Sequence, residues 1–170
     1  MRQLILMRHG KAETASGGGD HARSLSARGR AEAAEAGRRL AAVARPTLAL
    51  VSDSSRTRQT FDCVAPALDP APAVRHTRAI YGVTADAILA AVRALPDEES
   101  CVLVVGHNPG SGDLARRLAG SGDARDVAAL ANGFPTSCFA VIDLAGDRWA
   151  EVGTPGRLRF LLPVDERAGS

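Results

Sequence analysis

The sequence predicts an α/β domain, a three-layer α/β/α sandwich whose central sheet is mainly parallel. Short apolar runs at 2–7, 47–52 and 101–105 have the length of buried strands. The segments between them place apolar residues at helical spacing and follow a Ser or Thr that can cap a helix. Strands that alternate with helices put helices on both faces of a parallel sheet.

In the first half of the chain, the strand at 2–7 is followed by a polar loop that contains the glycine-rich stretch SGGGD. Ser26 caps a helix that we expect to reach about Ala44. After the strand at 47–52, Ser54 or Ser55 caps the next helix.

The second half starts with a Pro- and Ala-rich loop and ends with strands in a different arrangement. We expect, in order, a loop at 69–73, a helix from Thr84 to about Leu95, a strand at 101–105, a helix starting over 113–118, a turn near Asn132-Gly133, a hairpin of 138–144 with 148–152, and a last strand at 158–162.

Composition suits one ordinary globular domain, which we place at 1–163 with a loose tail at 164–170. The net charge is +2 and aromatic residues are 4%, so we expect no nucleic-acid partner. No apolar run approaches the ~20 residues of a membrane span, and we expect neither a membrane partner nor a secretory signal. Three cysteines without a C-x-x-C motif fit free thiols in the cytoplasm.

Basic side chains follow each of the three apolar runs. Arg8 and His9 follow the first run. Arg56 and Arg58 come shortly after the second, and His107 follows the third. Ligands of parallel sheets bind beyond the carboxyl ends of the strands. Because arginine matches the geometry of phosphate oxygens, this pattern predicts a site for an anion with several oxygens.

Other phosphate and hydrolase chemistries lack their motifs here. The chain has no G-x-x-x-x-G-K-[ST] stretch, so SGGGD is not a P-loop. A cysteine phosphatase needs an Arg six positions after its Cys, and position 107, six after Cys101, is His. Neither Asp-x-Asp nor G-x-S-x-G occurs, and the histidines lack metal-site spacing. We therefore expect no metal and no other cofactor.

Several segments together resemble one known family. They are MRHGKA at 7–12, DHARSLSARG at 20–29, SDSSRTRQT at 52–60, Ile80-Tyr81, VLVVGHNPG at 102–110, and the late stretches FPTSCFAVIDL, RWAEV and GRLRFLLP. These pieces span nearly the whole chain. The chain resembles the histidine phosphatase superfamily, which has the phosphoglycerate mutase-like fold, and within it the small bacterial phosphohistidine phosphatases called SixA.

The resemblance implies a role for each matching residue. His9, in the R-H-G motif, would be the nucleophile that takes the phosphoryl group. Arg8, Arg56 and His107 would bind the phosphoryl oxygens. Arg23 would be a further substrate-binding arginine, and its alternative is a solvated loop charge.

Three more residues belong to the same motifs. Gly10 would leave room for phosphate beside the nucleophile and so contribute to substrate binding. Asn108 is assigned to substrate binding by the resemblance. Arg58 is expected to make a structural ion pair on the surface of its helix.

A carboxylate is missing where the mutases of the superfamily carry their proton donor, shortly before a Tyr-Gly pair. Here residues 78–82 read RAIYG. Phosphohistidine needs such an acid less than a phosphate ester does, because its P–N bond is labile. Asp20, Asp53 and His107 stay open as alternative proton donors.

The resemblance thus implies a metal-independent phosphohistidine phosphatase that works through a phosphohistidine intermediate on His9. The resemblance implies a phosphorylated histidine-containing protein as partner, such as a phosphotransfer domain in signal transduction, and a monomer is favoured. Two alternatives stay open: a broad-specificity phosphatase of small phosphate esters, and a non-catalytic phosphate-binding scaffold. The complete set of Arg8, His9, Arg56 and His107 argues against the scaffold.

Overall fold

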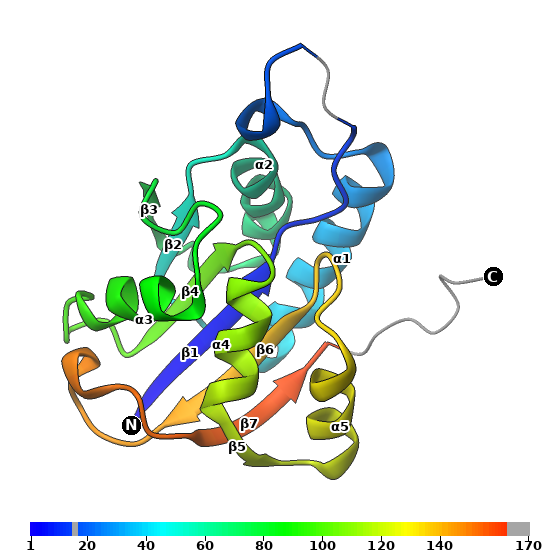
Figure 1. Cartoon of the computed structure of the whole chain (residues 1–170). Helices are drawn as coiled ribbons and strands as arrows, with labels where there is room; N and C mark the ends of the chain where they lie inside the picture. Colours follow the sequence, from blue (N-terminus) through cyan, green and yellow to red (C-terminus); the bar gives the residue numbers. More distant parts are fainter. Residues whose placement is uncertain (15–16, 163–170) are drawn as a thin grey trace.

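A computed structural model describes residues 1–14 and 17–162. In this part of the chain, one seven-stranded sheet has the order β3-β2-β4-β1-β6-β7-β5 (Figure 1). The strands are β1 (Arg2–Arg8), β2 (Leu48–Ser52), β3 (Ala73–Thr77), β4 (Cys101–Gly106), β5 (Ala119–Gly122), β6 (Phe139–Leu144) and β7 (Gly156–Leu161). Strands β1 to β4 run parallel to their neighbours among themselves, and β6 runs antiparallel to both β1 and β7. The predicted α/β class is confirmed.

Helices cover both faces of the sheet (Figure 1). Helices α1 (Ala27–Val43) and α2 (Ser55–Val64) pack on one face. Helices α3 (Ala85–Arg93), α4 (Gly110–Leu118) and α5 (Ala124–Asn132) pack on the other. Short 3-10 turns are η1 (Asp20–Ala22), η2 (Ala65–Ala67) and η3 (Trp149–Glu151).

Successive residues of β1 enter two separate apolar cores. Leu4 and Leu6 pack with residues of α3, α4 and α5, whereas Ile5 and Met7 pack with residues of α1 and α2. This alternation follows from the two-residue period of a strand. A strand buried on both faces reads as a continuous apolar run, which explains why LILM is so clear a strand signal.

Three helices begin where the sequence predicts. The side chain of Ser26 accepts a hydrogen bond from the Gly29 amide at the start of α1. Ser54 caps α2 and Thr84 caps α3 in the same way. Each cap satisfies one of the backbone donors that the first helical turn leaves free.

The predicted hairpin of 138–144 with 148–152 is wrong in its second part. Residues 149–151 form η3, and β6 pairs with β1 and β7 instead. The indole of Trp149 is fully buried, and its Nε1 donates to the Glu99 carbonyl at 2.6 Å. Burying this large ring with its donor satisfied turns the segment inward against α3 rather than along β6.

The sequence patterns do not reveal β3, β5 or α5. Strand β3 starts at Ala73, the end of the predicted loop 69–73, and its side chains are mostly exposed because it lies at one edge of the sheet. Strand β5, AGSG, lies at the other edge. Neither strand has an apolar run. Helix α4 also begins earlier than expected, at Gly110.

The predicted boundary at residue 163 and the tail at 164–170 lie outside the described residues. Within residues 1–14 and 17–162, no helix combines the length and the apolar character that crossing a bilayer requires.

Gly37 allows α1 and α2 to approach closely. A Cβ atom at this position would lie 2.8 Å from both the Cα atom and the carbonyl oxygen of Val64. Because these are backbone atoms, Gly37→Ala should lower the free energy of unfolding by roughly 1–3 kcal/mol, as overpacking does. This loss is expected even though alanine has a higher helix propensity than glycine.

Gly133→Ala is the matched control, since a Cβ atom there meets nothing within 4 Å and the backbone is extended at φ 170°. Its effect should stay within about 0.5 kcal/mol. Urea denaturation measures both variants. Similar losses in the two would contradict the tight α1–α2 contact.

Candidate active site

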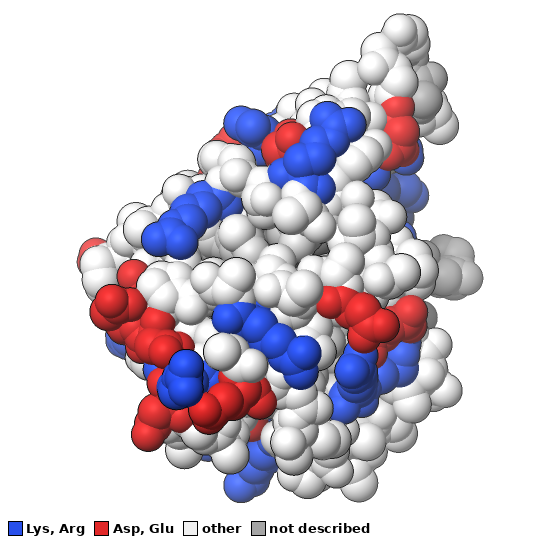
Figure 2. All heavy atoms as spheres, turned by 60° about the vertical axis from the view of Figure 1, so that its left-hand side comes forward, with Lys and Arg blue, Asp and Glu red and all other residues white. Residues whose placement is uncertain are grey.

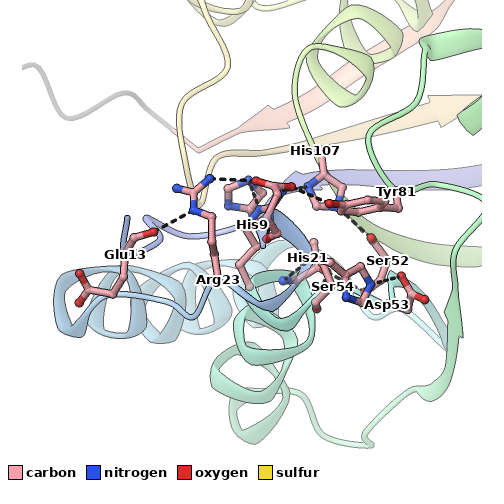
Figure 3. Close-up of polar contacts among 12 residues, drawn as sticks. His9, Glu13, His21, Arg23, Ser52, Asp53, Ser54, Tyr81 and His107 are labelled. Atoms are coloured by element: carbon pink, nitrogen blue, oxygen red, sulfur yellow. Dashed lines mark hydrogen bonds and ion pairs between the residues drawn. The ribbon is translucent and has the colours of Figure 1, made fainter. Parts of the chain in front are cut away.

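The ends of three neighbouring strands bring the sequence-predicted residues together (Figure 3). His9 follows β1, His107 follows β4, and Arg56 lies in the first turn of α2 after β2. The order β2-β4-β1 places these strand ends side by side, and the His9 amide donates to the Gly106 carbonyl at 3.0 Å. The imidazole centroids of His9 and His107 are 5.3 Å apart.

The guanidinium of Arg56 is bonded to both imidazoles. Its Nε donates to Nε2 of His9 at 3.3 Å, and its Nη2 donates to Nδ1 of His107 at 3.3 Å. Arg56 is 6% exposed. A buried guanidinium in this position can bind the oxygens of a phosphoryl group that lies between the two rings.

The backbone fixes the tautomer of His9. Nδ1 lies 2.7 Å from the Gly10 carbonyl oxygen, so Nδ1 carries the proton and donates it. Nε2 therefore keeps its lone pair. Burial lowers the pKa of His9 to about 4. The charges of Arg56 and Arg8 also lower this pKa, whereas the hydrogen bond to Gly10 raises it. A neutral imidazole with its lone pair on Nε2 can act as a nucleophile near pH 7.

His107 is held in the opposite tautomer. Because Arg56 donates to its Nδ1, the proton lies on Nε2, which donates to Ser52 Oγ at 2.8 Å. Burial lowers the pKa of His107 to about 3, with further lowering by His9 and Arg56. Ser52 is not among the residues predicted for the site, although a serine at the end of the apolar run LALVS is a signal for such a role.

Arg8 and Asn108 both contact the connection between α5 and β6. Arg8 Nη1 donates to the Phe134 carbonyl at 3.4 Å, and Asn108 Nδ2 donates to the same oxygen at 2.7 Å. Asn108 Oδ1 accepts from the Gly112 amide, so both polar atoms of its side chain have a partner within the protein. Arg8 Nε is buried without a partner among the described residues. Arg8, Asn108 and Phe134 line a cavity of about 430 Å³.

Gly10 is packed against the start of α1. A Cβ atom at Gly10 would lie 2.9 Å from the Gly29 carbonyl oxygen and 3.2 Å from Ser137 Oγ. The Gly10 amide donates to Thr60 Oγ1 at 2.9 Å. Contacts within the protein therefore explain why position 10 is a glycine, and a contact of Gly10 with substrate stays a prediction.

Asp20 and Tyr81 lie in the site as well. The Asp20 carboxylate accepts from the Tyr81 hydroxyl at 2.6 Å, from Arg56 Nη2 at 3.0 Å and from Arg23 Nη1 at 3.2 Å. These hydrogen bonds, that of Tyr81 foremost, hold the pKa of Asp20 well below its ordinary value. From the sequence, Asp20 is expected only as an alternative proton donor, and Tyr81 only as part of a motif.

Titratable groups also line the rim of the site. His21 Nε2 lies 2.8 Å from Asp53 Oδ1, and this hydrogen bond lowers the pKa of Asp53. Arg58 donates from Nε to the Asp53 backbone carbonyl at 2.9 Å, in place of the predicted ion pair.

Nowhere in residues 1–14 and 17–162 do three or more His, Cys, Asp or Glu side chains form a group that could hold a metal ion.

Comparisons with known proteins agree with this geometry. The histidine phosphatase superfamily (branch 1) matches residues 4–80. An uncharacterised protein of Mycobacterium tuberculosis is 38% identical over 149 residues, 86% of this chain and 91% of that protein. The solved structure of a candidate phosphohistidine phosphatase SixA from Nakamurella multipartitia is 30% identical, with a TM-score of 0.80 over 95% of each chain. A second candidate SixA, from Agrobacterium tumefaciens, is 30% identical, with a TM-score of 0.79 over 96% of this chain and 98% of that one.

The two SixA structures cover almost the entire described chain at this similarity, so the predicted phosphoglycerate mutase-like fold is confirmed. The family match begins in β1 and ends next to Tyr81, and it therefore includes the segments that carry His9, Arg23 and Arg56. Sequence, fold and site lead to the same conclusion: this chain belongs to the histidine phosphatase superfamily, is a phosphatase, and is similar to the SixA proteins.

Proposed function

We propose that this phosphatase hydrolyses phosphohistidine in a protein substrate, with His9 as its nucleophile and without a metal ion. One observation carries the proposal: the Gly10 carbonyl holds the proton on Nδ1 of His9, which leaves the Nε2 lone pair facing the buried guanidinium of Arg56. A neutral nucleophile next to a fixed cation suits attack on a phosphoryl group.

The reaction has two steps. The lone pair on Nε2 of His9 forms a bond to phosphorus while the P–N bond to the substrate imidazole breaks, and the departing imidazole nitrogen takes a proton from solvent. Water then attacks phosphorus, the Nε2–P bond breaks, and orthophosphate leaves. Arg8, Arg23 and Arg56 offset the charge on the equatorial oxygens, which is large in a loose transition state.

The lack of a suitable acid supports phosphohistidine as the substrate. Asp20 and Asp53 have lowered pKa values, so both are ionised at neutral pH. His107 has a pKa of about 3 and is neutral there. None of the three alternative proton donors is therefore in its acidic, proton-donating form at pH 7. A labile P–N bond needs such help less than an ester of a strongly basic alcohol does.

The substrate partner is a phosphorylated histidine-containing protein, such as a phosphotransfer domain. The two structures at 30% identity are those of candidate phosphohistidine phosphatases SixA, which supports this class of substrate. The free Cys63, Cys101 and Cys138 fit a reaction in the reducing cytoplasm.

Loss of the nucleophile should abolish turnover. With a phosphohistidine protein as substrate and EDTA present, His9→Ala should release orthophosphate at least about 10³-fold more slowly than wild type. His76→Ala is the control, because His76 is exposed on the edge strand β3. Wild-type activity that EDTA abolishes, or full activity in His9→Ala, would refute the proposed mechanism.

Turnover should depend strongly on the leaving group. Since a general acid contributes about 10²–10⁴-fold in rate, an enzyme without one should hydrolyse phosphohistidine and aryl phosphates at least about 10²-fold faster, in kcat/KM, than alkyl phosphates. Steady-state assays with the three substrates test this. Equal values would point to an unrecognised acid and favour a broad-specificity phosphatase.

The protonation state of His9 can be observed directly. Correlation of ring protons with ¹⁵N by NMR should show the Nδ1–H tautomer and a pKa of about 4. In the unfolded chain His9 has its ordinary pKa of about 6.5, so the unfolded state binds more protons between these values. The stability that depends on His9 should therefore rise with pH across that window. An ordinary pKa or an Nε2–H tautomer would contradict the assigned nucleophile.

A further inference from the structure

The Asp20 carboxylate is hydrogen-bonded to two arginines that the proposed function assigns to phosphate binding. It accepts from Arg56 Nη2 at 3.0 Å and from Arg23 Nη1 at 3.2 Å, and the Tyr81 hydroxyl adds a third donor at 2.6 Å. The three donors come from α2, from the residue after η1 and from the segment after β3. A phosphoryl group held by these arginines would need the same N–H groups.

We propose that Asp20 is an internal competitor for the anion site, so that its carboxylate has to leave Arg56 and Arg23 before a phosphate group can bind. The inference rests on the proposed function only in taking these two arginines as ligands of the phosphoryl oxygens. It adds a residue that lowers the affinity of this site for anions.

Burial places the carboxylate between Arg56 and solvent. The Arg56 side chain is 8% exposed, whereas that of Asp20 is 54% exposed. Figure 3 shows Arg23, Tyr81, His9 and His107 converging on the same small space. An anion approaching Arg56 from solvent therefore meets a group of the same charge that already holds its donors.

The backbone allows the side chain to be displaced without loss of the loop's anchor. Arg56 Nη1 also donates to the Asp20 backbone carbonyl, at 2.8 Å. This bond does not involve the carboxylate. Gly19, which precedes Asp20, has a φ of 77° and open space around it. A rotation of the Asp20 side chain is thus enough to free Arg56 Nη2 and Arg23 Nη1, while Arg56 Nη1 stays on the backbone carbonyl.

Competition of this kind weakens, by the same factor, every ligand whose phosphate group needs these donors, and a ligand that binds through phosphate alone is then left with little affinity. The apparent dissociation constant of such a ligand is the intrinsic constant divided by the fraction of molecules whose site is free. Orthophosphate has no other contacts to offset this factor, and a phosphohistidine protein has them. Asp20 therefore favours release of the product and disfavours stray anions.

The test is the affinity of the free enzyme for orthophosphate, measured by isothermal titration calorimetry. If the site is free in roughly a tenth of the molecules, Asp20→Ala should bind orthophosphate about tenfold more tightly than wild type. Asp20→Asn, which keeps the shape and one acceptor oxygen but not the charge, should bind more tightly by a smaller factor.

Asp147→Asn is the matched control. It removes the same charge from an exposed aspartate that pairs with the N-terminal ammonium group, outside the site. Its affinity should equal that of wild type, which excludes a general effect of net charge. Thermal unfolding of each variant verifies that the comparison is between folded proteins.

Two results would overturn the inference. Weaker binding in both Asp20 variants would show that the carboxylate supports Arg56 and Arg23 in their binding positions. Unchanged binding in both would show that the contact is not competitive. Because calorimetry requires no turnover, either result can occur with phosphohistidine hydrolysis intact, which separates this inference from the proposed function.

Discussion

The site depends on one buried cation, the guanidinium of Arg56. A charge removed from water has to be compensated by hydrogen bonds and opposite charge. Here Nε and Nη2 reach the two imidazoles, and the backbone and carboxylate of Asp20 take the remaining bonds. The same bonds set the tautomer of His107 and contribute to lowering the pKa of His9. The placement of a single arginine thus acts on both histidines, together with burial and, for His9, the Gly10 carbonyl.

The fold fixes that placement through one threonine hydroxyl. Thr60, one turn after Arg56 in α2, donates from Oγ1 to the Arg56 carbonyl at 2.7 Å and accepts from the Gly10 amide at 2.9 Å. Gly10 in turn accepts the Nδ1 proton of His9. A continuous chain of hydrogen bonds therefore joins the helix that carries the cation to the loop that carries the nucleophile. Such networks are stable only when every member is satisfied.

The sequence predicts what local patterns encode. Local signals include the apolar runs of β1, β2 and β4 and the caps Ser26, Ser54 and Thr84. These signals place His9, Arg56 and His107 beyond the carboxyl ends of neighbouring strands. The edge strands β3 and β5 lack apolar runs because solvent reaches their side chains. Trp149 escapes prediction because its partner, the Glu99 carbonyl, is distant in sequence. The contacts of Asp20 with Arg56 and Tyr81 escape it for the same reason, since only the folded chain brings these segments together.

The reversed direction of β6 has a consequence for how relatives of this protein can diverge. A parallel strand brings the loop that follows it to the site, whereas antiparallel β6 brings the loop that precedes it. That loop contains Phe134, whose carbonyl binds Arg8 and Asn108, and Ser137, whose amide binds the His9 carbonyl. Insertions between α5 and β6 would reshape the Arg8 side of the pocket while every strand keeps its register. New substrate preferences can therefore arise there without redesign of the sheet.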